Sequence, residues 1–159
     1  MPAPADAADA ATAGRAPRWR WRPATDADLP FLLRLRIAAR GPVLAAAGLD
    51  PTTEEHLARI RHHFADARLV LQGEAPVGLV KLDRAATPWV LLQLQLLPAA
   101  QRRGLGTALL RRLQAEAAAA GAGIQLFVFP PSPARRLYAR LGWREVGPSA
   151  HGLEMRWTP

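Results

Sequence analysis

The chain has 159 residues, of which 50% are apolar and 21% are charged, and this balance is typical of a single globular domain. It contains no cysteine, which excludes disulfides, cysteine-ligated zinc, iron–sulfur clusters and a catalytic thiol. The net charge of +8 leaves nucleic acid, an anionic membrane or a phosphorylated ligand as partner classes. Lys81 is the one lysine, so a coding bias toward arginine explains most of this charge.

Residues 1–17 contain no large apolar side chain except Met1, so we expect a disordered tail followed by one domain over residues 18–159. The tail has neither a basic start nor an apolar stretch, and it does not resemble a secretory signal. No apolar run reaches the ~18 residues that span a bilayer, so we expect a cytoplasmic protein with no membrane partner.

The first half of the domain alternates between extended and helical patterns. Apolar residues recur at helical spacing after Thr25 and Asp26, either of which can cap a helix, and Gly41-Pro42 is expected to interrupt that helix. The predicted elements are a strand at Trp19–Pro23, helices at Leu29–Arg40 and Thr53–Phe64, and a β-hairpin of Arg68–Leu71 and Val77–Leu82 with a Gly73-Glu74 turn.

The second half contains a longer strand and a long helix. Leucine and glutamine alternate over Leu92–Leu96, as in a strand with two distinct faces, whereas Ile124–Phe129 is apolar nearly throughout and predicts a strand covered on both faces. The predicted elements are strands at Trp89–Leu97, Ile124–Phe129, Trp143–Val146 and Leu153–Trp157, and helices at Gly104–Gly121 and Pro133–Leu141. This order predicts an α/β fold with one mixed, mostly antiparallel sheet of about six to seven strands, flanked by about four helices.

The segment Gln101–Thr107 joins a predicted strand to a predicted helix and has the composition of an anion-binding loop. The glycines of Gly104-Leu105-Gly106 let the backbone approach a ligand closely, and the first helical turn presents unpaired N–H groups. Arg102-Arg103 adds charged donors. The segment lacks the Gly-Lys pair of a Walker A loop, and Leu109 stands where a Rossmann fingerprint has its third glycine.

A second segment, Ser132–Trp143, has the features of a short helix with marked ends. Ser132 stands at the cap position, Pro133 at the first helical position and Gly142 at the stop. Tyr138 lies beside the apolar stripe of this helix, where packing in the core is the structural alternative to a functional role.

Together the two segments resemble those of the GNAT superfamily of N-acetyltransferases. In that superfamily an Arg/Gln-x-x-Gly-x-Gly/Ala loop follows a strand ending in a short apolar segment and proline, as Leu96-Leu97-Pro98 does here. A later helix carries Ala-x-x-Leu/Phe-Tyr before Gly-Phe or Gly-Trp, which Ala134–Tyr138 and Gly142-Trp143 match. The resemblance implies acetyl-CoA as cosubstrate and direct transfer of its acetyl group to a primary amine of a small molecule, peptide or protein.

The resemblance also implies roles for particular residues. The backbone of Leu96 and Leu97 is expected to pair with the pantetheine arm and to polarise the thioester carbonyl. Tyr138 is expected to protonate the departing thiolate as general acid, and Ser132 stands where many members have an asparagine that touches the CoA arm. The loop expected to hold the pyrophosphate comprises Gln101, Arg102, Arg103, Gly104, Leu105, Gly106 and Thr107.

No residue is assigned as the general base. Many members carry a glutamate on the fourth strand, where this chain has Gln93 and Gln95, which cannot accept a proton. His62-His63 does not predict a metal site, because adjacent helical side chains diverge, so no metal is expected. Candidate bases elsewhere, each also typical of a solvated surface, are Glu54, Glu55, His56, His62, His63, Asp83, His151 and Glu154.

Two alternatives from other classes stay open. The missing carboxylate on the fourth strand suggests a noncatalytic acyl-CoA-binding regulatory module. A nucleic-acid-binding domain rests on the charge alone, and since aromatic and basic residues interleave only at Trp19–Arg22, nucleic acid is not expected as a partner. We expect a monomer or a homodimer, with the acceptor amine chosen by Ile37–Phe64 and by the final hairpin near His151.

Overall fold

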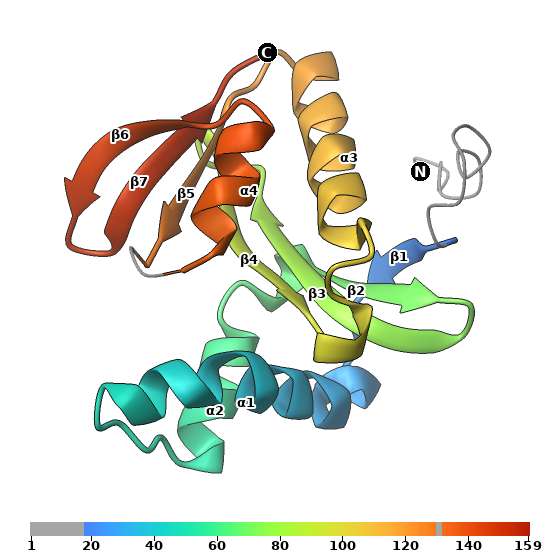
Figure 1. Cartoon of the computed structure of the whole chain (residues 1–159). Helices are drawn as coiled ribbons and strands as arrows, with labels where there is room; N and C mark the ends of the chain where they lie inside the picture. The colour runs from blue at the N-terminus through green and yellow to red at the C-terminus, as the bar shows by residue number, and fades with distance from the viewer. Residues whose placement is uncertain (1–17, 130–131) are drawn as a thin grey trace. The chain divides into compact units, whose positions relative to one another are not determined.

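Seven strands of the chain are hydrogen-bonded in the order β1-β2-β3-β4-β5-β7-β6 in a computed structural model of the protein (Figure 1). The structure describes residues 18–129 and 132–159, so the predicted tail over residues 1–17 lies outside the described residues. The strands are β1 (Arg20–Pro23), β2 (Ala67–Gln72), β3 (Ala75–Asp83), β4 (Trp89–Leu96), β5 (Ile124–Val128), β6 (Arg144–Ser149) and β7 (Gly152–Trp157). The α-helices are α1 (Leu29–Ala46), α2 (Thr53–Arg61), α3 (Leu105–Ala119) and α4 (Ala134–Arg140), with short 3-10 turns η1 (Asp26–Asp28), η2 (Phe64–Asp66) and η3 (Pro98–Ala100). The predicted α/β class is confirmed: β1 with β2, β2 with β3, β5 with β7 and β6 with β7 pair antiparallel, and β4 with β5 pairs parallel.

The backbone divides into two compact units, and β3 and β4 run through both of them. The first unit comprises residues up to Lys81 together with Gln93–Leu105, and the second comprises Leu82–Leu92 together with Gly106–Pro159. Among the described helices, none combines the length and the apolar character needed to cross a bilayer.

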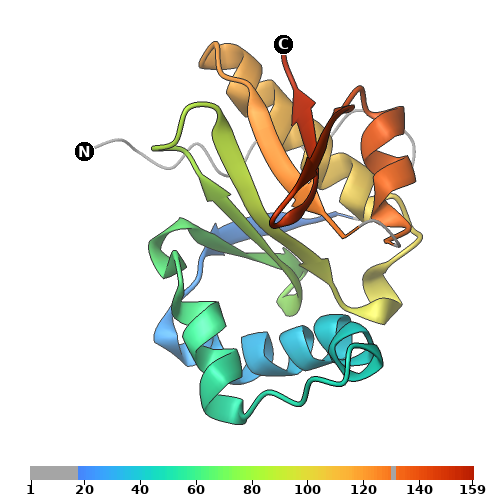
Figure 2. The ribbon, with the colours of Figure 1, turned by 90° about the vertical axis from the view of Figure 1, so that its left-hand side faces the viewer.

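In the first unit, α1 and α2 pack against a sheet of β1, β2 and β3. Strand β2 pairs antiparallel with β1 and, through the predicted turn at Gly73-Glu74, with β3. The two helices lie side by side in both views (Figures 1 and 2). The core of this unit contains Phe31, Leu32 and Leu35 of α1, Ile60 of α2, Ala67, Leu69 and Leu71 of β2, and Leu79 of β3.

Helix α1 continues through Gly41-Pro42, so the predicted interruption at this pair is wrong. Inside a helix, proline removes one N–H donor, and its ring crowds both the carbonyl four residues earlier and the Cβ of the residue before it. Gly41 has no Cβ and so avoids the second clash, and the helix continues past this point to Ala46. The extra turn brings Leu44 and Ala45 into the helix, where both line a cavity that is described below.

Helix α2 begins with a capping box and ends against a buried lysine. The Thr52 hydroxyl accepts the Glu55 N–H at 3.2 Å, and the Glu55 carboxylate accepts the Thr52 N–H at 2.6 Å. The helix ends at Arg61 instead of the predicted Phe64, because His63 has a left-handed φ of 53°. Beyond that end, Lys81 Nζ of β3 donates to the Ile60 carbonyl at 2.9 Å and to the His62 carbonyl at 2.5 Å.

Strands β3 and β4 approach each other closely at Gly78. A Cβ at this position would lie 2.6 Å from the backbone oxygen of Gln95 and 2.6 Å from the Leu96 side chain. Only glycine therefore allows β4 to follow this path as it nears its end at Leu96.

In the second unit, the residues of β5 alternate between two environments. Ile124, Leu126 and Val128 are buried, whereas Gln125 and Phe127 are half-buried. The prediction that both faces of this strand are covered therefore holds fully for one face and only in part for the other. In Figures 1 and 2, α3 runs alongside β5, and its inward residues Leu105, Leu109, Leu110, Leu113 and Ala117 are almost fully buried.

Strands β6 and β7 form a hairpin in which β6 is the last strand of the sheet. The strand β6 extends to Ser149, past the predicted end at Val146, with a register shift between Glu145 and Gly147. Pro148 is tolerated there because an edge strand has one row of backbone groups that needs no partner strand.

Candidate functional site

The end of β4 and the turn after it are held by local hydrogen bonds. The Leu97 N–H donates to the Val77 carbonyl of β3 at 2.8 Å, and the side-chain amide of Gln101 donates to the Leu96 carbonyl at 3.0 Å. Between these two bonds lies the turn η3, in which the Ala100 N–H donates a hydrogen bond to the Leu97 carbonyl at 2.9 Å. Gln101 therefore has a positioning role in this turn, in addition to the ligand contact that the resemblance implies.

The loop then reverses direction through two left-handed residues. Arg102 has a φ of 59° and Gly104 a φ of 81°, and α3 begins at the next residue, Leu105. Glycine adopts this conformation without strain, whereas an arginine there costs about 1–2 kcal/mol. Strained residues of this kind cluster at ligand-binding turns.

The electrostatics of this loop favour an anion. Gln101, Arg102, Arg103 and Gly104 are exposed, and the first turn of α3 contains no acidic residue. Within the described part of the chain, neither arginine has an ion pair. Two arginines without an ion pair in the described part of the chain thus directly precede the positive end of a 15-residue helix, where a phosphate is bound most readily.

The parallel ladder between β4 and β5 is short. Its register consists of Trp89 with Ile124 and Val90 with Gln125, both within the second unit. From Leu91 onward, the edge of β4 that faced β5 pairs with no strand of the described residues. Backbone groups at such an edge are available to an extended ligand.

Ser132 and Tyr138 both belong to the second unit. The Ser132 hydroxyl accepts the Ala134 N–H at 3.3 Å, which is a weak local contact and not the full helix cap that the sequence predicts. Tyr138 is 9% exposed, and its ring lies 5.6 Å from that of Trp143. Burial raises the pKa of Tyr138 to about 12, so its phenol stays protonated at neutral pH.

A cavity of about 250 Å³ lies in the first unit between α1 and α2. Its apolar wall includes Ile37, Leu44 and Leu49, and its polar wall includes Asp50 and His56. The buried His56 accepts the Nε–H of Arg36 at its Nδ1 atom, at 3.2 Å. Since arginine is always the donor, His56 carries its own proton on Nε2 and is not poised as a base.

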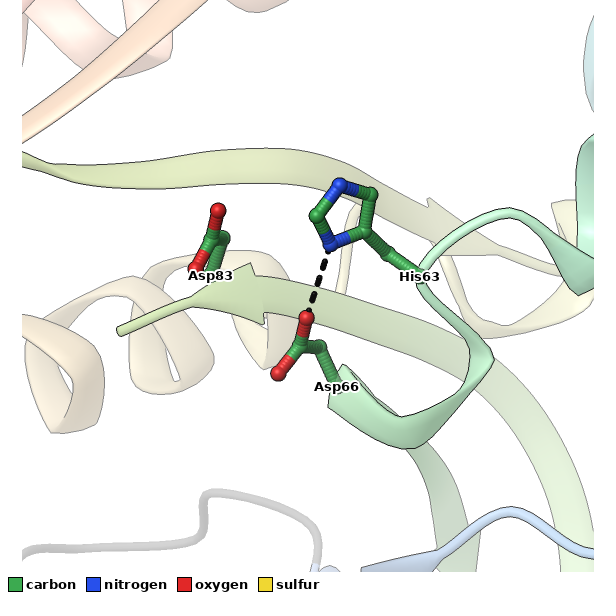
Figure 3. Close-up of side chains that lie close together, drawn as sticks. All are labelled: His63, Asp66 and Asp83. Carbon is green, nitrogen blue, oxygen red and sulfur yellow. Dashed lines mark hydrogen bonds and ion pairs between the residues drawn. The ribbon is translucent and has the colours of Figure 1, made fainter. Parts of the chain in front are cut away.

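His63 and Asp66 form a pair that the sequence interpretation overlooked, although the carboxylate follows the histidine by only three residues. Figure 3 shows the imidazole turned toward the carboxylate, with His63 Nδ1 and Asp66 Oδ2 separated by 2.9 Å. This contact fixes the orientation of the His63 ring. The expected absence of a metal stays a prediction.

Two further residues were not singled out by sequence reasoning. Gly78 shapes the path of β4 through a contact with another strand, which no local pattern reveals. Lys81 is 1% exposed. It is a single charged residue within the apolar run of β3, and this pattern could have predicted a buried charge with hydrogen-bond partners.

Comparison with known proteins agrees with these features. The model of the acetyltransferase (GNAT) domain matches residues 61–145, which is more than half of the chain. That stretch includes β4, the loop after it, α3 and α4. The protein is thus an acetyltransferase by class. More particularly, the chain belongs to the GNAT acetyltransferase family.

Solved structures share the fold. An acetyltransferase from Thermus thermophilus has a TM-score of 0.69 at 26% identity, with 89% of this chain and 97% of that chain covered. The PaiA N-acetyltransferase from Thermoplasma acidophilum, solved in complex with coenzyme A, has a TM-score of 0.70 at 17% identity, with 89% and 99% covered. The ribosomal-protein-S18-alanine N-acetyltransferase from Escherichia coli has a TM-score of 0.66 at 21% identity, with 89% and 94% covered. No curated protein sequence matches the chain.

Proposed function

We propose that the protein transfers an acetyl group from acetyl-CoA to a primary amine by direct attack of the amine on the thioester. The observation that carries the proposal is the loop between β4 and α3, where left-handed Arg102 and Gly104 lead into a helix N-terminus. The family membership and the coenzyme A in the Thermoplasma acidophilum structure support it. The chain has no cysteine to form an acyl-enzyme, which agrees with direct transfer.

The residues of the loop fit the pyrophosphate of CoA. The backbone N–H groups of Leu105, Gly106 and Thr107 lie in the first turn of α3, where no helical carbonyl precedes them as partner. Arg102 and Arg103 supply two positive charges for the phosphates. Gln101 supports the turn through its bond to Leu96, and Gly104 gives it the required reversal.

At the end of β4, the backbone of Leu96 and Leu97 is proposed to meet the pantetheine arm. Neighbouring residues of a strand direct their N–H groups to opposite edges, and the Leu97 N–H is already bonded to Val77 of β3. The Leu96 N–H therefore points to the other edge, which makes it the donor available to a thioester carbonyl. Ser132 is assigned to the CoA arm on the resemblance alone.

Tyr138 is proposed as the general acid that protonates the departing thiolate. Its burial keeps the proton on the phenol at neutral pH, although the raised pKa makes it a weaker acid than a free tyrosine. A CoA thiolate, with an ordinary thiol pKa of about 8.5, draws this proton only if the phenol is well placed when the carbon–sulfur bond breaks.

The test is consumption of acetyl-CoA with a panel of primary amines, followed by mass spectrometry of the products. A second experiment measures acetyl-CoA binding by isothermal titration. Gly106→Leu places a bulky side chain in the first turn of α3 and is expected to abolish this binding. Ala118→Leu adds the same side chain at an exposed site near the other end of the helix and serves as the matched control. Unchanged affinity in Gly106→Leu would show that the loop is not the CoA site.

A noncatalytic acyl-CoA-binding module is the second candidate, because Gln93 and Gln95 leave β4 without a carboxylate. It predicts acetyl-CoA binding that Gly106→Leu abolishes, with no thioester consumption for any amine in the panel. The amine screen separates the two candidates directly.

A further inference from the structure

We infer that Glu154 of β7 binds the ammonium group of the acceptor and takes up its proton, which selects a primary amine on an apolar stem. The inference rests on the proposed acetyl transfer and names the acceptor class for it. All the residues that carry it belong to the second unit of the chain.

The strand register places Glu154 on the face of the sheet opposite the buried one. Ile124, Leu126 and Val128 of β5 are buried, and their partners on β7 are Trp157, Met155 and Leu153. The alternate positions pair Gln125 with Arg156 and Phe127 with Glu154. Because side chains of paired residues point to the same face, Phe127 and Glu154 stand together on the second face.

The surroundings of Glu154 on that face are apolar and aromatic on one side and open on the other. The ring of Phe127 lies 5.6 Å from the ring of His151, with the two planes at 68°. On the other side the register partner is Gly147, where even an added Cβ would meet nothing within 4 Å. An amine therefore has space beside the carboxylate and an apolar wall for its stem.

The hydrogen bonding of Glu154 leaves it one oxygen for a ligand. Its Oε1 atom accepts the Nε–H of Arg156 at 2.6 Å, and its Oε2 atom has no partner among the described residues. The Glu154 side chain is only 17% exposed, so water covers little of it. Arg156 offsets part of the charge, but the free oxygen of a shielded carboxylate still accepts an N–H from an ammonium group more strongly than a solvated one does.

The same part of the sheet lies beyond the end of the ladder between β4 and β5. The ladder stops at Val90 with Gln125, and Phe127 is two residues further along β5. Beyond Gln125, the edge of β5 that faced β4 has no recorded strand partner within the described ranges. Glu154, the register partner of Phe127, therefore stands beside the part of β5 that is open along this edge.

The proton balance of the step is complete. The ammonium R–NH₃⁺ gives one proton to the Glu154 carboxylate, and the neutral amine attacks the thioester carbon. The new carbon–nitrogen bond forms as the carbon–sulfur bond breaks, and the nitrogen loses its second proton as the thiolate gains one from Tyr138. The second proton lost by the nitrogen reprotonates Tyr138 through solvent. Glu154 then releases the first proton to water.

The experiment compares Glu154→Gln with Glu145→Gln, using n-hexylamine and acetyl-CoA as substrates. Glu145 on β6 is the matched control, because it also pairs with an arginine, Arg135, at 2.5 Å, but is 45% exposed and lies opposite buried Met155. We expect Glu154→Gln to raise the KM for n-hexylamine about tenfold or more, with the KM for acetyl-CoA unchanged. Glu154→Asp, which keeps the charge, is expected to recover part of the loss, and Glu145→Gln to behave as the parent chain.

Each other outcome has a defined meaning. Equal amine KM values in Glu154→Gln and Glu145→Gln overturn the inference while acetyl transfer stands. Turnover of other amines but not of n-hexylamine by the parent chain overturns the apolar-stem acceptor class. If Glu154→Gln does not fold, Glu154→Asp and Phe127→Ser decide alone, and an unchanged amine KM in both overturns the inference. If the parent chain consumes acetyl-CoA with none of the amines in the panel, the proposed function itself fails and this inference fails with it.

Discussion

Tyr138 is the side chain whose environment and proposed chemistry can be separated most cleanly by a single substitution. Tyr138→Phe removes the hydroxyl and keeps the ring that lies 5.6 Å from Trp143, so the packing of α4 is preserved. If the phenol donates a proton to the thiolate, turnover falls about a hundredfold or more, while the affinity for acetyl-CoA changes little. Steady-state kinetics and isothermal titration measure the two quantities, and equal turnover in both chains would assign Tyr138 to core packing alone.

Lys81 links the stability of the first unit to pH. Burial lowers its pKa from 10.5 to about 8, with the nearby charge of Arg36 acting in the same direction. The unfolded chain therefore binds this proton more tightly than the folded chain, so the free energy of unfolding rises as the pH increases above 8. A neutral amine still has two N–H donors for its two partners, the carbonyls of Ile60 and His62.

We expect the free energy of unfolding to increase by up to about 2 kcal/mol between pH 8 and pH 9.5. Urea denaturation at these pH values measures it, with Lys81→Met as the chain that lacks the titrating group and should show no such rise. The range stops at pH 9.5 because Tyr138, with a pKa raised to about 12, has the opposite effect at higher pH, where tyrosine ionises only in the unfolded chain. A slope shared by both chains would mean that another group is responsible.

Among the elements, α3 provides a matched pair of glycines at its two ends. Gly104 has a φ of 81° and Gly121 a φ of 66°, and an added Cβ would meet nothing within 4 Å at either position. Substitution by alanine therefore costs backbone strain alone, about 1 kcal/mol at each site. We expect Gly104→Ala and Gly121→Ala to lower the unfolding free energy equally, while only Gly104→Ala weakens acetyl-CoA binding, by about tenfold. Equal affinities for acetyl-CoA in both variants would show that the left-handed conformation at Gly104 is not needed for CoA binding.

The elements that the sequence predicted well are those whose signals are local. The start of α2 at Thr53, the turn at Gly73-Glu74 and the glycine loop before α3 are all contained within a few residues. The continuation of α1 through Gly41-Pro42 was missed, because a rule about proline took no account of the missing Cβ before it. The weaker cover of one face of β5 was missed for a related reason, since apolar side chains on both faces do not say which face is packed more tightly.

At the scale of the whole molecule, the candidate site likewise contains residues that local motifs predict and residues that only the assembled sheet brings together. Gln101–Thr107 and Tyr138 were predicted from contiguous motifs. The pairing of Glu154 with Phe127, and the closeness of Gly78 to Gln95, depend on strands that are far apart in the sequence. Register between such strands is set by the assembled sheet, so no reading of one segment could have supplied it.

The net charge of +8 leads to the last prediction, which concerns the folded chain as a whole. A specific CoA site stabilises the fold by mass action, so acetyl-CoA at a hundred times its Kd adds about 2.7 kcal/mol to the unfolding free energy. For a chain of this length the melting temperature then rises by roughly 5–10 °C. A chain that uses its arginines for nucleic acid would instead be stabilised by duplex DNA, steeply less so as salt increases.

Differential scanning fluorimetry at 50 and 200 mM NaCl measures both effects on the same chain. We expect the shift with acetyl-CoA to persist at 200 mM NaCl, because the proposed site combines Arg102 and Arg103 with the backbone N–H groups of α3, which salt screens less than charges alone. Gly106→Leu should lose that shift, and duplex DNA should give none at 200 mM NaCl in either chain. If duplex DNA raised the melting temperature as much as acetyl-CoA does at 200 mM NaCl, the positive charge would have to be explained by nucleic-acid binding. The excess of arginine outside the loop then could not be ascribed to coding bias.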